Sequence, residues 1–508
     1  MRTSLIPGLI ITFLACLLAA CTGQGQPSLL PITQLPGTAQ TFDPTLRATE
    51  PTGLAVTATS QVISSQPATP TPGGVSSPNT HYTLTAELDY NLHDLSVQEQ
   101  IVYTNRTSEP IPELLLIVEP SRYPGTFQLS ELTLNEKPVA NFIQDIGHLR
   151  IPLDQPLPPG DNLRLDIIYD LLLPSPDPGF YGRPVPFGYS ERQTNLVDWY
   201  PFFPPYVPGQ GWLAHEASLW GEFLVYEVAD FQVNLRLKDS RQDLTIAASA
   251  PAQRDGDWYR YQHPEARNFV WSVSHQYQLS TAQVGAVTVY GYAFPVHAQA
   301  GAAALQATVE ALDLYTKIYG PYPRQALSLV EADFLDGMEY DGLYFLSKGF
   351  YNIYTGTPAE YLWAIAAHET AHQWYYAQVG NDQALEPWLD EALCTYSERL
   401  YYEKVHPEAL DWWWDYRVYY YEPKGWVDGS VYNPEGYRAY RDAVYLNGAL
   451  FLEDLRSLVA DQAFFAFLQA YVKRYAGKIA TSDDFFTVLN EYTQANLQPL
   501  LDKYFRER

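Results

Sequence analysis

Two histidines and a glutamate are spaced for metal chemistry in the segment AAHETAHQWYY, residues 366–376. Residues four apart lie on one face of a helix, so the imidazoles of His368 and His372 can converge on one ion. Each ring can then give one nitrogen to zinc, and Glu369 lies beside the metal, where it can take a proton from an activated water. The competing interpretation is an ordinary helix that carries two of the chain's ten histidines.

A catalytic zinc needs a third protein ligand and an open position. Glu391 follows His372 by nineteen residues, in EPWLDEALCTYSE, where Pro387 and several acidic residues suit the start of a second helix. A turn between two packed helices would return Glu391 to the imidazoles. Glu398 lies on the same helix face two turns later and can accept the outer N–H of a ligand histidine, or it can be a surface glutamate.

The HETAH motif followed by Glu391 resembles the gluzincin peptidases, specifically the aminopeptidase N family. Upstream, Gly337, Met338 and Glu339 resemble the family's strand that runs along the substrate and binds the free α-amine through its glutamate. Downstream, Tyr445 resembles the tyrosine that donates to the oxyanion. The resemblance covers about 80 to 508 and implies one zinc per chain, with Glu369 as general base.

The sequence departs from the family pattern at three places. Asp390 and Ala392, on either side of Glu391, stand where the family has asparagine and glycine. Tyr340 stands where the family has asparagine, beside the expected amine site, and Asn447 stands where it has lysine. The chain also ends soon after LQPLLDKYF, so we expect a short form without the large C-terminal helical domain of many relatives. A more open cleft would then admit longer peptides.

The N-terminus resembles a bacterial lipoprotein signal. Residues 1–20 combine a basic start at Arg2 with a short apolar stretch, and Leu18 to Cys21 resemble a lipobox in which Cys21 is acylated. The alternatives are a plain signal peptide and an uncleaved anchor. Residues 21–80 are rich in Thr, Ser, Pro and Gly, which predicts a flexible tether between the lipid anchor at Cys21 and the folded part.

Two folded regions follow the tether. Alternating segments such as Tyr82 to Leu88 and Phe231 to Leu237 predict a multidomain α and β protein that begins with an antiparallel β-sandwich over 81–294. Helical patterns dominate from 295 to 508, and the resemblance implies that this region is a thermolysin-like zinc peptidase domain.

Two aromatic segments have open interpretations. DWYPFFPPYVPGQGW, residues 198–212, can line a cleft or pack under the sandwich. The WWW and YYY runs between 412 and 421 can form a stacking surface for apolar substrate side chains or pack between helices.

Composition narrows the class of function. A net charge of −27 argues against nucleic-acid binding, because nothing would neutralise the phosphates. One of the three cysteines lies in the predicted signal segment and Cys21 would carry the lipid, so Cys394 would be the one free cysteine of the mature chain. We therefore expect no disulfide and a buried thiol at Cys394.

These observations predict an extracytoplasmic, lipid-anchored zinc aminopeptidase that cleaves peptides with a free N-terminus. One alternative is a zinc endopeptidase or other amide hydrolase with the same metal site. The other is a non-catalytic cell-surface binding lipoprotein, which would have no need for the full set of catalytic residues.

Overall fold

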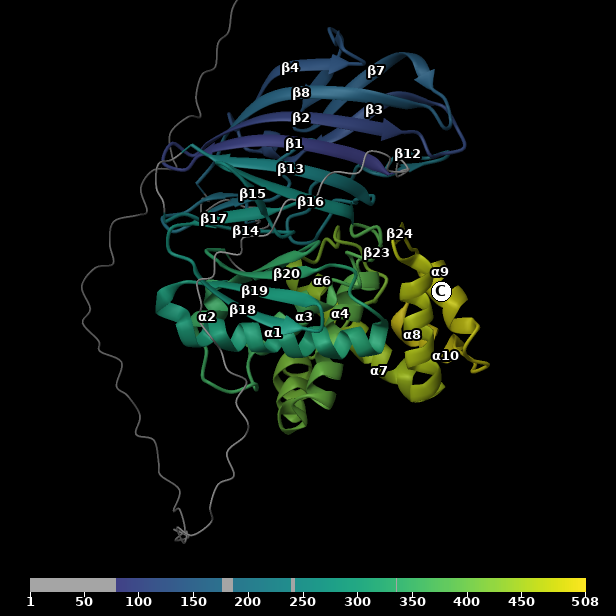
Figure 1. The fold of residues 1–508 in the computed structure, drawn as a ribbon. Helices are drawn as coiled ribbons and strands as arrows, with labels where there is room; N and C mark the ends of the chain where they lie inside the picture. The colour runs from purple at the N-terminus through teal and green to yellow at the C-terminus, as the bar shows by residue number, and fades with distance from the viewer. Residues whose placement is uncertain (1–78, 176–185, 239–242, 335) are drawn as a thin grey trace, which may run out of the picture. The chain divides into compact units, whose positions relative to one another are not determined.

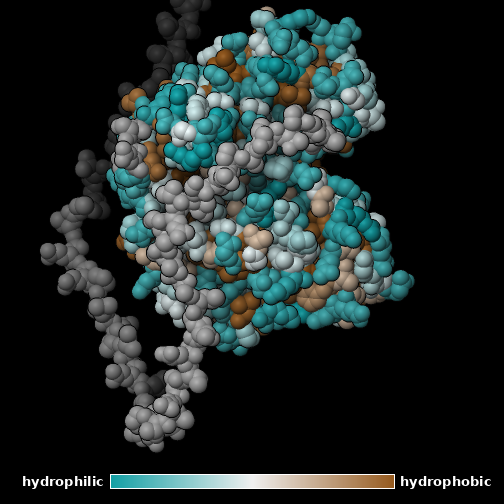
Figure 2. Space-filling model, viewed as in Figure 1, coloured by the Kyte–Doolittle hydropathy of each residue, from teal (hydrophilic) through white to brown (hydrophobic). Residues whose placement is uncertain are grey.

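The computed structural model describes residues 79–175, 186–238, 243–334 and 336–508 (Figure 1). The predicted signal segment, Cys21 and the predicted tether as far as residue 78 lie outside the described residues. The tether was predicted to extend to residue 80, but Thr80 already begins the first strand. Within these residues, no helix combines the length and the apolar character needed to cross a membrane. On the face drawn in Figure 2, hydrophilic residues cover much of the surface, in keeping with the high net charge.

The N-terminal region consists of β-sheets. Its eight-stranded sheet has the order β15-β16-β13-β1-β2-β8-β4-β5. The strands are β1 (Thr80–Asp89), β2 (Asp94–Thr104), β4 (Phe127–Leu134), β5 (Lys137–Pro138), β8 (Asn162–Leu172), β13 (Ala229–Leu237), β15 (Gln253–Asp255) and β16 (Trp258–Ala266).

Smaller sheets complete this region. A three-stranded sheet has the order β3 (Ile111–Val118), β7 (Gly147–Leu157) and β6 (Ile143–Asp145). A four-stranded sheet has the order β14 (Thr245–Ala248), β17 (Trp271–Ser274), β10 (Thr194–Leu196) and β9 (Gly188–Tyr189). The strands β11 (Tyr206–Val207) and β12 (Gly211–Trp212) form a two-stranded sheet. A short 3-10 helix, η1 (Glu119–Arg122), follows β3.

The alternating pattern forms strands as expected. In β1 every second side chain is buried, from Tyr82 to Leu88. However, β1 pairs with β13 in parallel, so the prediction of a wholly antiparallel arrangement is wrong at this pair. Alternation of apolar and polar residues is the same in both arrangements, and these two strands are far apart in the sequence, so the pattern cannot give their relative direction.

A five-stranded sheet introduces the second region, with the order β18-β19-β20-β22-β21. Its strands are β18 (Gln278–Val284), β19 (Val287–Ala293), β20 (Ala326–Ala332), β21 (Gly337–Tyr340) and β22 (Leu343–Ser347). The hairpin of β18 and β19 precedes the predicted boundary between 294 and 295, yet it pairs with β20. A hairpin pattern does not indicate which sheet the hairpin joins. Strand β21 is an edge of this sheet.

The described chain after this sheet is mainly helical (Figure 1). The α-helices are α1 (Ala298–Tyr319), α2 (Lys348–Asn352), α3 (Tyr361–Ala371), α4 (Trp388–Lys404), α5 (Leu410–Trp412), α6 (Tyr437–Arg441), α7 (Gly448–Val459), α8 (Asp461–Tyr475), α9 (Ser482–Asn490) and α10 (Gln498–Tyr504). The 3-10 helices here are η2 (Pro295–His297), η3 (Pro407–Ala409) and η5 (Tyr419–Tyr421). Two short strands, β23 (Val379–Gly380) and β24 (Lys478–Ile479), pair in parallel.

Two π-helices interrupt the helical region, η4 (Trp413–Val418) and η6 (Asp442–Asn447). Each continues directly from a short α-helix, and η6 leads directly into α7. Turns of this type are rare and occur frequently at functional sites. Both contribute side chains to the cluster described next.

Candidate metal centre

Helices α3 and α4 bring the HExxH histidines and Glu391 together. His368 and His372 lie at the C-terminal end of α3, and Glu391 lies in the first turn of α4. The Nε2 atoms of the two rings are 3.2 Å and 3.6 Å from Oε2 of Glu391. One ligand atom of each residue lies within 4.8 Å of the other two. All three side chains are at least 96% buried.

This arrangement fits a tetrahedral zinc site. With metal–ligand distances of 2.0–2.1 Å, ligand atoms of a tetrahedral zinc are roughly 3.3 Å apart. The Nδ1 atoms of both rings donate hydrogen bonds to other groups. Nδ1 of His368 donates to Glu398 at 2.8 Å, and Nδ1 of His372 donates to the carbonyl of Tyr375 at 3.1 Å. Both Nε2 atoms therefore face the same carboxylate and are available to a metal.

The same contacts fix the charge of Glu391. Burial alone would raise the pKa of its carboxyl group, but hydrogen bonds from the two imidazoles hold that pKa well below its usual range. The ligand is thus an anion, as zinc requires.

Glu398 is fully buried, which excludes its interpretation as a surface glutamate. It accepts from His368, from the indole N–H of Trp413 at 2.8 Å and from two nitrogens of Arg417 at 2.8 Å and 2.9 Å. The π-helix η4 supplies both Trp413 and Arg417. Part of the WWW run therefore supports the metal centre from behind, a role that the sequence pattern did not suggest.

Glu369 points into the space beside the metal ligands. Its side chain is 4% exposed, and among the described residues Oε2 has no hydrogen-bond partner. Burial raises the pKa of Glu369 to about 8, although the neighbouring imidazoles oppose the shift. A Cβ atom at Gly337 would lie 2.0 Å from Oε1 of Glu369, so only glycine leaves room for this carboxylate beside β21.

Tyr445 comes from the other π-helix, η6. Its hydroxyl donates to Oε1 of Glu391 at 2.6 Å, and its ring lies parallel to that of His368 with centroids 6.1 Å apart. Burial and the Glu391 charge raise the pKa of Tyr445 well above its ordinary value, so the hydroxyl stays protonated at neutral pH. It is a donor at the edge of the site.

Glu339 lies in β21 and is 4% exposed. Its Oε1 accepts from Gln383 at 3.2 Å. One carboxylate oxygen from each of Glu222, Glu339 and Glu391 lies within 4.8 Å of the other two. Sequence reasoning missed Glu222, because it belongs to a loop between β12 and β13 that has no motif of its own.

Two connected spaces surround these residues. The larger is a cleft of about 420 Å³ lined by the metal ligands, Glu369, Glu339, Glu222 and Tyr445. The smaller, of about 50 Å³, also includes Glu222 and Glu339 in its wall, together with Met338, Tyr340 and several other aromatic residues. We call these two spaces the metal cleft and the side pocket.

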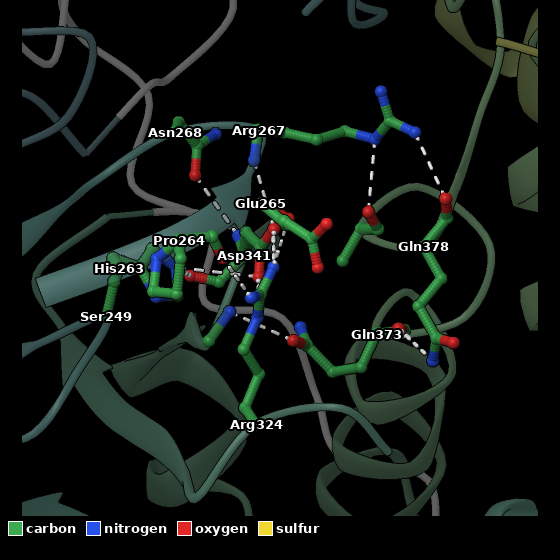
Figure 3. Close-up of polar contacts among 12 residues, drawn as sticks. Ser249, His263, Pro264, Glu265, Arg267, Asn268, Arg324, Asp341, Gln373 and Gln378 are labelled. Atoms are coloured by element: carbon green, nitrogen blue, oxygen red, sulfur yellow. Dashed lines mark hydrogen bonds and ion pairs between the residues drawn. The ribbon is translucent and has the colours of Figure 1, made fainter. Parts of the chain in front are cut away.

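The end of β21 is anchored by a buried ionic cluster (Figure 3). Asp341 accepts from Nε and Nη2 of Arg324 at 2.9 Å and 2.8 Å, and from the backbone N–H of Arg267 at 3.0 Å. Its Oδ1 is 3.5 Å from Nε2 of His263. Burial alone would raise the pKa of Asp341, but Arg324 and His263 hold it well below its usual range.

Gln373 connects this anchor to the metal helix. Its Oε1 accepts from the N–H of Gly342 at 3.0 Å, and its Nε2 donates to the carbonyl of Tyr340 at 3.0 Å. Gln373 directly follows His372, so the turn after Glu339 and the second metal ligand are held by one side chain. Tyr340, which departs from the family pattern, is buried and does not displace these contacts.

The aromatic segment 198–212 packs inside the N-terminal region rather than at the metal cleft. Trp199, Tyr200, Phe202 and Phe203 are buried in its hydrophobic core. Cys394 is also buried, as expected of a packed thiol.

A buried pair of imidazoles facing a carboxylate, with a second carboxylate beside them, defines a metal-dependent hydrolase site. Comparison with known proteins identifies the class more narrowly: residues 303–504 match the model of the Peptidase family M1 domain. This region is therefore similar to the zinc metallopeptidase domains of family M1.

Several curated aminopeptidases are similar to this domain. Aminopeptidase M1-B of Oryza sativa subsp. japonica is 26% identical over 223 residues, which are 41% of this chain and 26% of that protein. Endoplasmic reticulum aminopeptidase 2 of Homo sapiens is 28% identical over 229 residues, which are 42% of this chain and 24% of that protein. The match thus spans about a quarter of these relatives' length.

Solved structures extend the likeness to the whole fold. An M1 zinc metallopeptidase from Deinococcus radiodurans matches with a TM-score of 0.58 and 20% identity over 84% of this chain and 93% of that chain. A mutant of that enzyme bound to a Tyr-Ser-Ala substrate matches with a TM-score of 0.59 over 85% and 95%. A β-rich region followed by a helical region is therefore the shared two-domain architecture.

Proposed function

We propose that this protein is a zinc-dependent aminopeptidase that removes N-terminal residues from peptides. The observation that carries the proposal is the triangle of Glu222, Glu339 and Glu391 next to the two imidazoles. An ammonium group that donates to three oxygens at about 2.8 Å holds them roughly 4.5 Å apart. The carboxylates of the triangle fit that spacing.

The proposed metal ligands are His368, His372 and Glu391. Zinc bound there would supply a Lewis acid that acidifies a water and polarises the scissile carbonyl. Glu398, held by Trp413 and Arg417, orients His368 through Nδ1.

Glu369 is the proposed general base. It takes a proton from the attacking water and then gives it to the leaving amine. Gly337 keeps β21 close without displacing this carboxylate. Tyr445 is the proposed donor to the oxygen on which negative charge develops, since its hydroxyl is protonated and borders the metal cleft.

Glu339 and Glu222 are the proposed ligands of the substrate's α-ammonium group. Because they also line the side pocket, the first side chain would enter that pocket, where Met338 forms part of the wall. An ammonium fixed at this point places the first peptide bond at the metal, which is the physical basis of exopeptidase action.

The test compares aminoacyl-arylamides and matched N-acetylated peptides as substrates, with and without a zinc chelator. We expect chelator-sensitive release from the free amines and at least a tenfold lower kcat/KM after acetylation. Equal cleavage of blocked and free peptides would favour the endopeptidase alternative instead. Zinc binding without turnover of either substrate would favour the binding lipoprotein.

An extracytoplasmic location through a lipid anchor at Cys21 remains part of the proposal. It is supported by the lipobox-like sequence alone. Replacing Cys21 with serine should release the protein from the membrane fraction, and unchanged membrane association would contradict the anchor.

A further inference from the structure

A groove of about 390 Å³ lies beside the metal cleft. Its wall includes Trp412, Tyr416, Tyr420, Tyr361 and Tyr421, together with Glu360. We call it the aromatic groove. It is built from the WWW and YYY runs, which the proposed chemistry uses only through Trp413.

The aromatic groove adjoins the metal cleft. Tyr361 and Tyr421 line both spaces, and their hydroxyl groups are 3.0 Å apart. At the other end, Glu222 and Glu339 line both the metal cleft and the side pocket. The side pocket and the aromatic groove have no common lining residue in the described part of the chain. The metal cleft therefore lies between them.

This order gives the substrate a direction. In the proposed function the α-ammonium group and the first side chain occupy the end with Glu222 and Glu339. The chain that follows the cleaved bond must leave the metal cleft elsewhere, and the aromatic groove opens beside Tyr361 and Tyr421. We propose that the aromatic groove binds the second and third residues of peptide substrates; this inference rests on the proposed function.

The surface of the groove indicates which residues it accepts. Tyr416 and Tyr420 are 56% and 73% exposed, and no lysine or arginine contributes to its wall. A contiguous patch of large, exposed aromatic rings commonly marks a binding surface, whereas single exposed rings do not. The groove therefore favours apolar and aromatic side chains, which stack on tyrosine and tryptophan rings.

Glu360 adds a polar feature to this wall. It is 7% exposed, and its Oε2 accepts from the backbone N–H and the hydroxyl of Thr355 at 2.7 Å and 2.6 Å. Its Oε1 has no hydrogen-bond partner among the described residues. A buried acceptor left in this state is costly unless something donates to it. Because this oxygen is shielded from solvent, Glu360 contributes negative charge to the groove wall rather than an acceptor for the peptide.

The experiment compares three substrates with the same first residue: Leu-arylamide, Leu-Gly-Gly and Leu-Phe-Phe. We expect wild-type kcat/KM to be about tenfold higher for Leu-Phe-Phe than for Leu-Gly-Gly, because stacked aromatic pairs contribute at this level. The double variant Tyr416→Ser/Tyr420→Ser should reduce that ratio to less than threefold by lowering kcat/KM for Leu-Phe-Phe, while turnover of Leu-Gly-Gly stays unchanged.

Tyr419→Ser is the matched control. Tyr419 is 52% exposed and precedes Tyr420, but it stacks on Trp414 and does not line the groove. It should keep the wild-type ratio. An unchanged ratio in the double variant, or no preference for Leu-Phe-Phe in the wild type, would overturn the groove proposal. Turnover of Leu-arylamide by the same protein would still support the proposed aminopeptidase function.

A second readout separates the groove from turnover. Leu-Phe-Phe binding to the Glu369→Gln protein, measured by calorimetry, should weaken by about tenfold when Tyr416 and Tyr420 are also replaced by serine. If the wild type cleaves none of the three substrates, the proposed function fails. The calorimetric result then decides the groove by itself: equal affinities with and without the two tyrosines would reject it.

Discussion

Two buried clusters of histidine and carboxylate, one around Asp341 and one around Glu391, lie on either side of Gln373. They differ in the groups that donate hydrogen bonds to the carboxylate. In the cluster around Asp341, both carboxylate oxygens accept from Arg324. Around Glu391, the partners are two imidazoles and a tyrosine hydroxyl, with no arginine on that carboxylate among the described contacts. The arginine of this region, Arg417, instead pairs with Glu398.

The difference distinguishes a structural cluster from a binding site. A buried carboxylate that is neutralised by arginine needs nothing further, and removing a partner is strongly destabilising. A buried carboxylate that faces two imidazoles is different, because each ring can exchange the proton on its Nε2 atom for a metal ion. Two similar sets of residue types therefore have different roles, and the position of arginine is the feature that separates them.

The most severe way to break the metal cluster without removing a ligand is Glu369→Gln. We expect bound zinc to remain near one per chain and turnover to fall by about 10³-fold, since only the proton acceptor is lost. Metal analysis and arylamide kinetics on the same preparation measure both quantities. Turnover within tenfold of wild type would remove Glu369 from its assigned role.

The Glu398→Gln variant tests the support behind the metal. Loss of this charge leaves Arg417 unpaired and weakens the orientation of His368, so zinc affinity should fall by about 10- to 100-fold. Competition with a chromophoric chelator measures the affinity. Glu403→Gln, which removes a carboxylate of the same helix from its arginine partners, is the control and should leave zinc affinity unchanged.

Glu222→Gln tests the ammonium site. We expect KM for free-amine arylamides to rise by about tenfold, with kcat and zinc content nearly unchanged, because one charged hydrogen-bond partner is lost. Glu216→Gln, an exposed glutamate of the same loop, should have no effect. An unchanged KM in the Glu222 variant would show that Glu339 and Glu391 suffice.

We expect the smallest effect on turnover from Asp341→Asn, which removes the carboxylate charge that pairs with Arg324. At pH 7 this variant should lose about 3 kcal/mol of stability, while kcat changes only a few-fold. The folded-state pKa of Asp341 is depressed, so its contribution is present above the ordinary value near 3.9 and is lost as pH falls below it.

Denaturant unfolding at pH 7 and at pH 3 checks this dependence. The gap between wild type and Asp341→Asn should narrow at the lower pH. Asp313→Asn, at an exposed helical ion pair with Lys317, should change stability by less than about 0.5 kcal/mol at either pH. A gap that does not depend on pH would show that the loss comes from packing rather than charge.

The sequence predicted the parts of the site that depend on local geometry. His368, Glu369 and His372 follow from the period of a helix, and Glu391 with Glu398 follow from the first turns of the next one. In each case, the relevant residues are neighbours within one element or two consecutive ones.

Features that depend on distant pairing were not predicted. Glu222 reaches Glu339 from a loop of the N-terminal region, and the parallel pairing of β1 with β13 joins strands far apart in sequence. Trp413 and Arg417, both from the π-helix η4, contact Glu398 from a segment that has no metal motif of its own. Patterns within short windows contain no information on such contacts.

The two π-helices also have a consequence for how this gene can change. In a regular helix each residue advances the direction of the side chain by about 100°. Deleting one residue from Asp442–Asn447 would allow a regular helix to form in the place of η6. That helix would carry α7 onward with little change, but Tyr445 would point away from Glu391. A single-codon deletion would therefore leave a folded protein with the hydroxyl removed from its site.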